Sequence, residues 1–172
     1  MDPLSFPMLA GAALSQAFAF LFGRLAHVLD NRKNPSVEAE QIDMPEVLEG
    51  DLQPLQANAE IIDDNILQLQ ALSGKLSTYE RNSDRVVATD EELLEDLGEL
   101  RYLLEQIYGQ QITFAGEDRA SSGVRVNMHL GTLAGDARGI EADVVRNAQV
   151  SQTADQVTEG ARIIGVKGKR VG

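Results

Sequence analysis

The chain of 172 residues has no cysteine, no tryptophan and only two histidines. The absence of cysteine excludes disulfide bonds, thiol nucleophiles and thiolate metal sites, and it is consistent with a reducing compartment. The histidines, His27 and His129, lie far apart in the sequence, and neither has a companion at the spacing of metal ligands. We therefore expect no metal site and no cofactor.

Patterns that carry catalysis are missing as well. No glycine-rich loop with a lysine follows a strand-like segment and opens a helix, so nucleotide binding has no support. The acidic pairs Asp63-Asp64 and Glu91-Glu92 are of a kind that is ordinary on exposed helix faces, and they do not by themselves indicate acid–base catalysis. We expect a protein that is not an enzyme.

Positive charge is scarce, since 15 lysines and arginines stand against 27 aspartates and glutamates for a net charge of −12. This balance argues against nucleic acid as a partner, because phosphates require clustered basic residues. The charge is also uneven: residues 1–33 carry +1, residues 34–118 carry −16 and residues 119–172 carry +3. The chain thus divides into an apolar head, an acidic middle and a mildly basic, glycine-rich tail.

Apolar surface is concentrated near the start, where the twenty residues 4–23 carry no charge. Burial of the large side chains there is worth on the order of 15–25 kcal/mol. As a helix the segment would rise about 30 Å, which is the hydrocarbon thickness of a bilayer. We expect a helix that starts at Asp2-Pro3, or later at Pro7. The candidate membrane-inserting residues are Leu4, Phe6, Leu9, Leu14, Phe18, Phe20, Leu21 and Phe22.

This segment has two destinations, the centre of a helical core or a bilayer. A secretory signal needs positive charge before the apolar run, and residues 1–7 offer only Asp2. A permanent span is weakened by Gly11, Ser15, Gln16 and several alanines. The core and membrane interpretations are compatible if the helix is buried at rest and released later.

Two further helices are expected in the acidic middle. An apolar stripe at helical spacing runs from Leu52 to Leu76 and predicts one helix of about 25 residues. A capping box at 89–92, with Thr89 as the cap, opens a second leucine-rich helix that Gly109 ends. Residues 32–54 contain three prolines and are expected to be a connector with one short helix. Residues 79–88 form a polar turn with a short helical piece at 85–88.

The tail has a different pattern. Residues 111–114 form a short strand-like run, and apolar residues alternate with polar ones from Val124 to Leu130, as in a strand with one buried face. Three outcomes are open: a disordered tail, a small β-arch or solenoid, or strands that stack on other copies of the chain. In a stack of that kind, Asn127 would form a ladder of side-chain amides. The candidate assembly motif within 124–145 comprises Val124, Val126, Asn127, Leu130, Gly131, Leu133, Gly135, Gly139 and Ile140.

The sequence therefore predicts a mainly α protein. Residues 1–110 form a small antiparallel helical bundle with a hydrophobic N-terminal helix, and residues 111–172 form a glycine-rich tail that is β-prone or disordered. In this scheme residues 4–29 carry the membrane-active helix, residues 36–109 enclose it, and residues 120–172 assemble or gate it.

The combination resembles the bacterial Bell-domain proteins, the counterparts of the fungal HeLo and animal necroptosis-executor bundles. The opening Met1-Asp2-Pro3-Leu4-Ser5 is similar to common openings of the fungal group, and residues 127–140 are similar to RHIM-like bacterial amyloid signalling motifs. The chain departs from that motif class in two respects. Leu130-Gly131-Thr132-Leu133 stands in place of its usual Val/Ile-Gln-Ile/Val-Gly core, and more than thirty residues follow Ile140.

The resemblance implies an effector of regulated cell death in antiphage immunity. In such a system an amyloid-like template passes from a STAND/NLR-type receptor with a matching motif to the effector, which forms homo-oligomers. The bundle would then release its first helix into the lipids of the inner membrane. A cytoplasmic protein that moves to the inner face of the cell membrane on activation is the corresponding expectation.

Two other classes remain open. In the first, the protein is a structural or adaptor protein whose first helix is permanent core and whose tail oligomerises or binds a partner. In the second, the protein is constitutively anchored in a membrane. Leakage of liposomes separates the effector from the adaptor, and membrane association without any trigger identifies the anchored protein.

Overall fold

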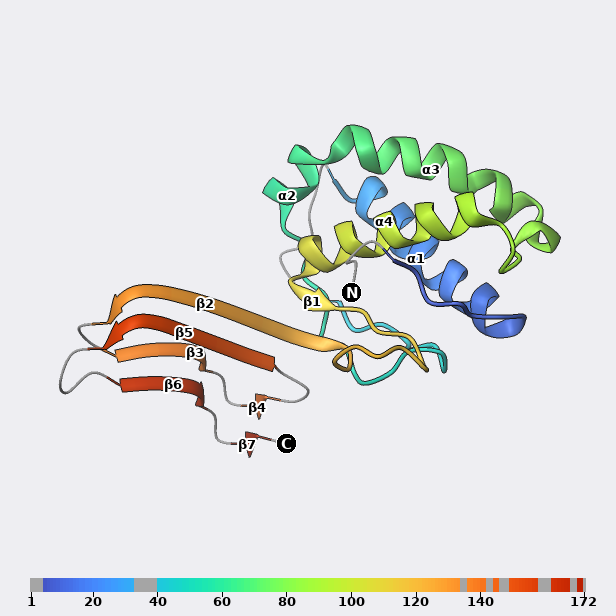
Figure 1. The fold of residues 1–172 in the computed structure, drawn as a ribbon. Helices are drawn as coiled ribbons and strands as arrows, with labels where there is room; N and C mark the ends of the chain where they lie inside the picture. The colour runs from blue at the N-terminus through green and yellow to red at the C-terminus, as the bar shows by residue number, and fades with distance from the viewer. Residues whose placement is uncertain are drawn as a thin grey trace.

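Helices occupy the first two thirds of the chain and strands occupy the rest. The computed structural model describes residues 5–32, 40–133, 136–141, 144–145, 149–157, 162–167 and 170–171. The helical elements are α1 (Ala12–Asp30), α2 (Ala59–Asp64), α3 (Ile66–Arg81), the 3₁₀ helix η1 (Ser83–Arg85) and α4 (Glu91–Tyr108). The strands are β1 (Gln110–Gln111), β2 (Gly123–Leu133), β3 (Asp136–Glu141), β4 (Val144–Val145), β5 (Gln149–Val157), β6 (Arg162–Lys167) and β7 (Arg170–Val171). The expected fold class, a mainly α bundle followed by a β-prone tail, is confirmed (Figure 1).

The helix α1 begins at Ala12, so the predicted start at Asp2-Pro3 is wrong for the residues described. Residues 5–10 are not helical, and the amide of Leu9 turns back to the carbonyl of Pro7 at 2.8 Å. Gly11 precedes the helix with a φ of 57°, a conformation that glycine adopts without strain. The alternative start at Pro7 is wrong as well, since α1 begins five residues later, and residues 1–4 lie outside the described part.

The predicted 25-residue helix from Leu52 to Leu76 is wrong as a single element. Pro54 lies in a non-helical segment, and the side chain of Asn58 caps α2 by accepting the amides of Glu60 and Ile61 at 3.0 and 3.3 Å. Asn65 then separates α2 from α3. The apolar stripe nevertheless identified buried positions, which include Leu52, Leu55, Ile62, Leu69, Leu72 and Leu76.

The start of α4 is capped by Asp90 and not by the predicted Thr89. The carboxylate of Asp90 accepts the amide of Leu93 at 3.1 Å, which satisfies a free N–H group of the first turn. Gly109 ends the helix in the left-handed conformation, as predicted. The short helical piece lies at Ser83–Arg85, two residues before its predicted place, and the described part of the connector, 40–54, contains no helix.

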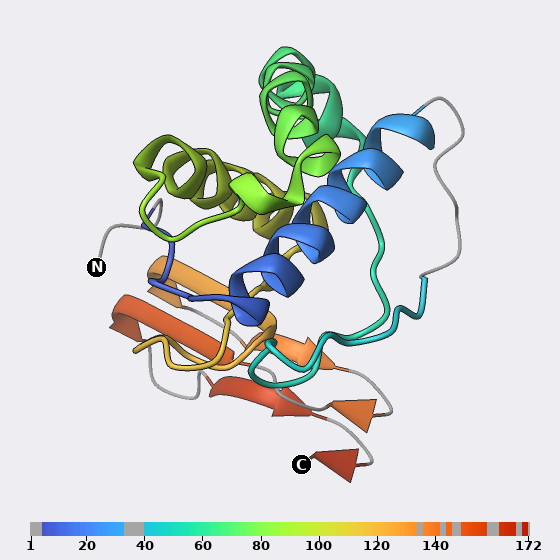
Figure 2. The same cartoon turned by 90° about the vertical axis from the view of Figure 1, so that its right-hand side faces the viewer.

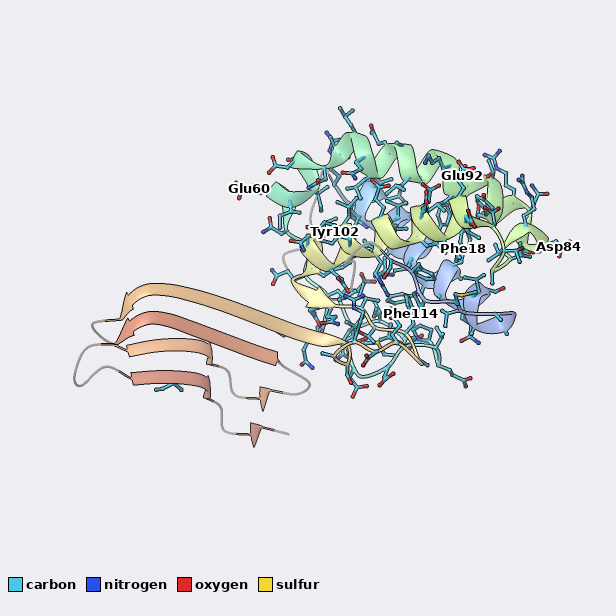
Figure 3. All side chains as sticks on the ribbon, in the orientation of Figure 1. Phe18, Glu60, Asp84, Glu92, Tyr102 and Phe114 are labelled. Atoms are coloured by element: carbon cyan, nitrogen blue, oxygen red, sulfur yellow. The ribbon has the colours of Figure 1, made fainter. Side chains whose placement is uncertain are left out.

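The core lies where α1 meets α3 and α4 (Figure 2). All three helices contribute leucines that are fully buried: Leu14, Leu21, Leu25, Leu69, Leu76, Leu93, Leu97, Leu100 and Leu104. Phe18 on α1 and Phe114 in the segment below the helices are buried, whereas Glu60, Asp84 and Glu92 are exposed (Figure 3). The apolar helix α1 is therefore a central element of the bundle, and these three acidic residues are exposed to solvent.

Residues 111–122 pack against the bundle before the chain enters β2. Ile112 and Phe114 are buried in the helical core, and Thr113 donates its amide to the Ser122 hydroxyl at 2.9 Å. Gly50 pairs with Ser122 at a φ of 89°, where an added Cβ would lie 2.9–3.0 Å from Ser121 and Ser122. The strand predicted at 111–114 is shorter than expected, because β1 covers only Gln110–Gln111. The division of the chain at residue 110 stays a prediction.

The strands of the tail pair in two tiers (Figure 1). The first tier is β2, β3 and β4 (residues 123–145), and the second tier is β5, β6 and β7 (residues 149–171). Each strand of the first tier pairs in parallel with its counterpart in the second, β2 with β5, β3 with β6 and β4 with β7. Of the three outcomes considered for the tail, the described residues adopt the arrangement of a small β-solenoid.

The second tier was not recognised in the sequence. The register joins residues 24 positions apart between β2 and β5 and 26 positions apart in the other two pairs. Its partners include Val126↔Val150, Leu133↔Val157, Ile140↔Val166 and Val145↔Val171. A search for a degenerate internal repeat with this period is the signal that would have found the second tier. The long segment after Ile140 is thus the partner of the predicted motif.

Candidate functional site

The predicted membrane-inserting residues divide into three groups. Leu9, Leu14, Phe18 and Leu21 are buried in the bundle core. Phe6, Phe20 and Phe22 are partly buried and pack against that core. Leu4 lies outside the described residues. Phe6 and Leu9 belong to the non-helical segment before α1, so the helix itself carries Leu14, Phe18, Phe20, Leu21 and Phe22.

By length and composition α1 is able to cross a membrane. Its 19 residues form the one helix of the described part of the chain that is long and apolar enough, although a core helix of a soluble protein meets the same criterion. The exposed residues of α1 are uncharged from its start to Gly23 (Ala12, Ser15, Gln16, Ala19 and Gly23), and the charged Asp30 is exposed at its end. The uncharged exposed residues are therefore compatible both with water and with lipid.

Apolar burial accounts for most of what holds α1 in place. Five large apolar side chains of the helix are buried: Leu14, Phe18, Leu21, Leu25 and Val28. At about 1.5–3 kcal/mol each, their burial contributes on the order of 8–15 kcal/mol. Lipid provides a similar apolar environment and water does not. Departure of α1 into water is thus opposed by this full amount, whereas transfer into lipid is opposed by much less.

Polar contacts of α1 gather at its C-terminal half. Glu40 accepts from Arg24 at 3.1 Å, and its carboxylate lies 3.0 Å from Nε2 of His27. Glu40 also pairs through its backbone with Leu55, at 2.7 Å in both directions. These side chains are partly exposed, so the Arg24–Glu40 ion pair contributes only modestly. They fix the end of α1 against the segment that precedes α2.

A buried arginine forms the most unusual polar cluster of the described residues. The Arg101 side chain on α4 is 1% exposed, and it donates to the Glu117 carboxylate, itself 6% exposed, at 2.6 Å. Arg101 also donates to the carbonyl of Ser5 and lies over the Phe6 ring, 5.4 Å from its centroid. Burial lowers the pKa of Arg101 from its ordinary value, and the carboxylate of Glu117 opposes that change.

Sequence reasoning missed this cluster. Arg101 falls on the face of α4 that Leu97 and Leu104 define, because it follows Leu97 by four residues. A basic residue at a core position of an amphipathic helix was the available signal. Its partners were not accessible from the sequence, since Glu117 and Ser5 are 16 and 96 positions away.

The predicted assembly motif lies on the first tier. Val124, Val126, Asn127, Leu130, Gly131 and Leu133 belong to β2, Gly139 and Ile140 belong to β3, and Gly135 lies outside the described residues. Asn127 pairs with Ser151 and not with another asparagine. A continuous ladder of Asn127 amides needs identical strands in successive layers, and this register does not provide them.

The register pairs residues of opposite charge between the tiers. Asp136 is the register partner of Arg162, and Glu141 is the register partner of Lys167. Opposite charges at paired positions stabilise strand pairing by about 0.2–1 kcal/mol, and like charges destabilise it. At these two positions the second tier is thus the electrostatic complement of the first.

The two ends of β2 have different neighbours. Its first two residues, Gly123 and Val124, pair with β1, and the remainder pairs with β5. The strand order β1-β2-β5 places these neighbours on opposite edges of β2. β1 follows α4 after a single residue, Gly109, and therefore joins the first residues of β2 to the end of the helical bundle.

In comparisons with known proteins, no protein-family model, no curated protein and no solved structure matches this chain. Within the residues described, no group of three or more histidine, aspartate or glutamate side chains is arranged to hold a metal ion.

Proposed function

We propose that this protein is a membrane-disrupting effector of regulated cell death that is activated by templated stacking of its tail. In the resting chain α1 is stored in the bundle core. Assembly of the tail with a receptor of the STAND/NLR type and with further copies leads to the release of α1 into membrane lipid. The observation that carries the proposal is a helix able to span a bilayer, held in the core mainly by apolar burial.

The energetics of α1 support storage followed by transfer. The side chains that stabilise α1 in the core, Leu14, Phe18 and Leu21 among them, are those that a bilayer also accepts. The exposed residues Ala19 and Gly23 add little cost to insertion because they are small. The apolar side chains of α1 are therefore shielded from water either in the bundle core or in lipid.

The tail supports templating through the edges of its tiers. A parallel pair of strands leaves hydrogen-bonding groups on both outer edges, which are able to pair with another chain. If the first tier of one copy follows the second tier of another, Asp136 meets Arg162 and Glu141 meets Lys167 again. Charges would then alternate along the stack at a spacing of about 4.8 Å per tier. A second copy of the chain is therefore a suitable partner for this edge.

Dye leakage from vesicles of phosphatidylethanolamine and phosphatidylglycerol tests the proposal. Preassembled full-length chain is added as seed to fresh full-length chain, and leakage is expected only in the seeded samples. Ala19→Asp leaves the fold intact because Ala19 is exposed, but it places a charge within the inserting helix. Such a charge costs about 2.5–3.5 kcal/mol, so insertion is expected to fall about a hundredfold.

Leu67→Asp is the matched control, because it introduces the same charge at a site on α3 that is 79% exposed. The proposal predicts that Leu67→Asp leaks like the parent chain and that Ala19→Asp does not leak. Equal leakage by the two variants, or sealed vesicles with the seeded parent chain, contradicts the membrane function.

The second candidate function is an adaptor that oligomerises through its tail while α1 stays in the core. The complete burial of Leu14, Leu21 and Leu25 favours it, since these residues lie at the centre of the bundle. For this function the seeded chain assembles, the vesicles stay sealed, and α1 remains protected from hydrogen exchange. A constitutively anchored protein, in contrast, associates with vesicles without seeds.

A further inference from the structure

Three segments that are distant in the sequence meet at Arg101. This residue lies on α4, its guanidinium donates to Glu117 in the segment that leads into β2, and it also donates to Ser5 in the segment that leads into α1. Ring contacts join the same three places: Phe6 lies under the guanidinium and contacts Phe114, with 5.5 Å between the ring centroids.

Glu117 links the cluster to the fold of its own segment. One carboxylate oxygen accepts from Arg101 at 2.6 Å, and the other accepts the backbone amide of Phe114 at 2.7 Å. The carboxylate thus closes the turn at 114–117 and holds Arg101 at the same time. A displacement of this turn necessarily removes the ionic partner of Arg101.

The burial of the guanidinium makes the contact sensitive to loss of a partner. A buried charge is tolerated when it is paired and hydrogen-bonded, and it is strongly unfavourable when one partner leaves. The Nε atom of Arg101 already has no hydrogen-bond partner within the described residues. Loss of Glu117 would leave Arg101 with the Ser5 carbonyl alone, so the side chain would be driven toward water and away from Ser5 and Phe6.

We propose that Arg101 is a latch that couples the segment before α1 to the segment before the β-stack. Movement of residues 114–117, as when the tail is pulled into an assembly, breaks the Arg101–Glu117 pair and frees residues 5–10. The coupling is reciprocal, because two sites that share one interaction affect each other equally. The role of the latch in activation rests on the proposed function, but the coupling between the two segments is testable without a membrane.

The test measures access to position 9 in the full-length chain. Leu9 is 8% exposed and the chain has no cysteine, so Leu9→Cys supplies a single protected thiol whose labelling rate reports departure of the N-terminal segment. Glu117→Gln, which removes the charge with little change of shape, is expected to raise that rate about tenfold, within the usual range of coupling between sites. Arg101→Leu is expected to raise it at least as much.

Arg119→Leu is the matched control. Arg119 pairs with Glu105 at 2.9 Å and therefore also joins the segment 111–122 to α4, but through a different carboxylate from the one that holds Arg101. The latch predicts that Arg119→Leu leaves the labelling rate of the thiol at position 9 within about twofold of the parent rate. An equal rise in the Arg119 and Glu117 variants overturns the latch, because it would show general loosening of the segment.

A second reporter separates the latch from global unfolding. Leu76 on α3 is fully buried and distant in sequence from the cluster, so Leu76→Cys places the thiol at a site that only unfolding of the bundle exposes. If Glu117→Gln raises labelling at position 76 as much as at position 9, Arg101 is a structural residue and the latch is wrong.

In the reverse direction, Phe6→Ala is expected to accelerate hydrogen exchange at the Phe114 amide, and unchanged exchange also contradicts the latch. If the labelling rates agree with the latch while vesicles stay sealed in the leakage experiment, the membrane function is contradicted and the latch is not.

Discussion

The hydroxyl of Tyr79 donates to the carboxylate of Asp90 at 3.0 Å, and this bond joins the end of α3 to the start of α4. The other oxygen of the same carboxylate caps α4 by accepting the amide of Leu93. One aspartate therefore fixes the angle at which α4 enters the core, where it meets α1 and α3. The polar turn between the helices, residues 82–90, is held by this residue.

Removal of Asp90 is expected to destabilise the bundle. Asp90→Ala loses the cap and the bond to Tyr79, so the free energy of unfolding should fall by about 2 kcal/mol. Tyr79→Phe loses only the second bond, and a fall of about 1 kcal/mol is expected. Thr89→Ala is the control, since Thr89 is exposed, and a change within about 0.5 kcal/mol is expected. Urea denaturation of the full-length chain measures all three variants.

Two glycines are expected to respond to alanine with opposite signs. Gly50 has a φ of 89° and lies against Ser121 and Ser122, so Gly50→Ala should lower the stability by more than about 1 kcal/mol. Gly74 lies within α3 with open space around it, and Gly74→Ala should raise the stability by about 0.5–1 kcal/mol. Thermal unfolding of both variants measures the difference, and a stabilised Gly50→Ala variant would contradict the packing of residues 111–122 on the bundle.

Alkaline pH is expected to destabilise the bundle through Tyr108. Burial raises the pKa of Tyr108, and the positive charge of Arg24 opposes this rise. Because the folded pKa lies above the unfolded value of about 10, the contribution is fully present below pH 10 and is lost as the pH rises through the folded pKa. Unfolding free energies at pH 9 and above pH 10 should therefore differ less in Tyr108→Phe than in the parent chain. Tyr102→Phe, at a more exposed position, is the control that should not remove this pH dependence.

Charge reversal tests the register of the two tiers. Asp136→Arg places like charges at the paired positions 136 and 162, so assembly of the full-length chain should slow. Arg162→Asp alone should have the same effect. The double variant restores opposite charges, and its rate of assembly, followed by light scattering, should return to within a few fold of the parent rate. A double variant that assembles as slowly as either single variant would rule out the pairing of β3 with β6.

Sequence patterns located the core of the bundle better than the ends of its elements. The leucine spacing identified the buried residues of α3 and α4, because burial of one helix face is a local periodic signal. The stripe from Leu52 to Leu76 crossed Pro54, which lies in a non-helical segment, and Asn58, whose side chain caps α2 and starts the helix there. Leu52 and Leu55 reach the core from a non-helical segment, which the pattern alone does not distinguish from a helix.

The contacts that depend on distant partners were not accessible from the sequence. Arg101 has a sequence signal as a basic residue on an apolar face, but its partners are fixed only by the folded chain. The second tier has a weak signal, since its residues are rarely identical to their partners in the first tier. Val126↔Val150 is an identical pair, whereas Leu130↔Ala154 and Asp136↔Arg162 are not. Because few paired positions are identical, the period of the repeat is a weaker signal than the leucine spacing of the helices.

The central claim is that α1 exchanges the bundle core for lipid when the tail assembles. Gln16 is exposed on α1, so Gln16→Cys accepts an environment-sensitive fluorophore without disturbing the core. The direct measurement is the emission of this fluorophore in the full-length chain with vesicles, before and after addition of preassembled chain. The account predicts a blue shift and quenching by lipid-bound quenchers only after the seeds are added. Emission that stays unchanged while the tail assembles would contradict it.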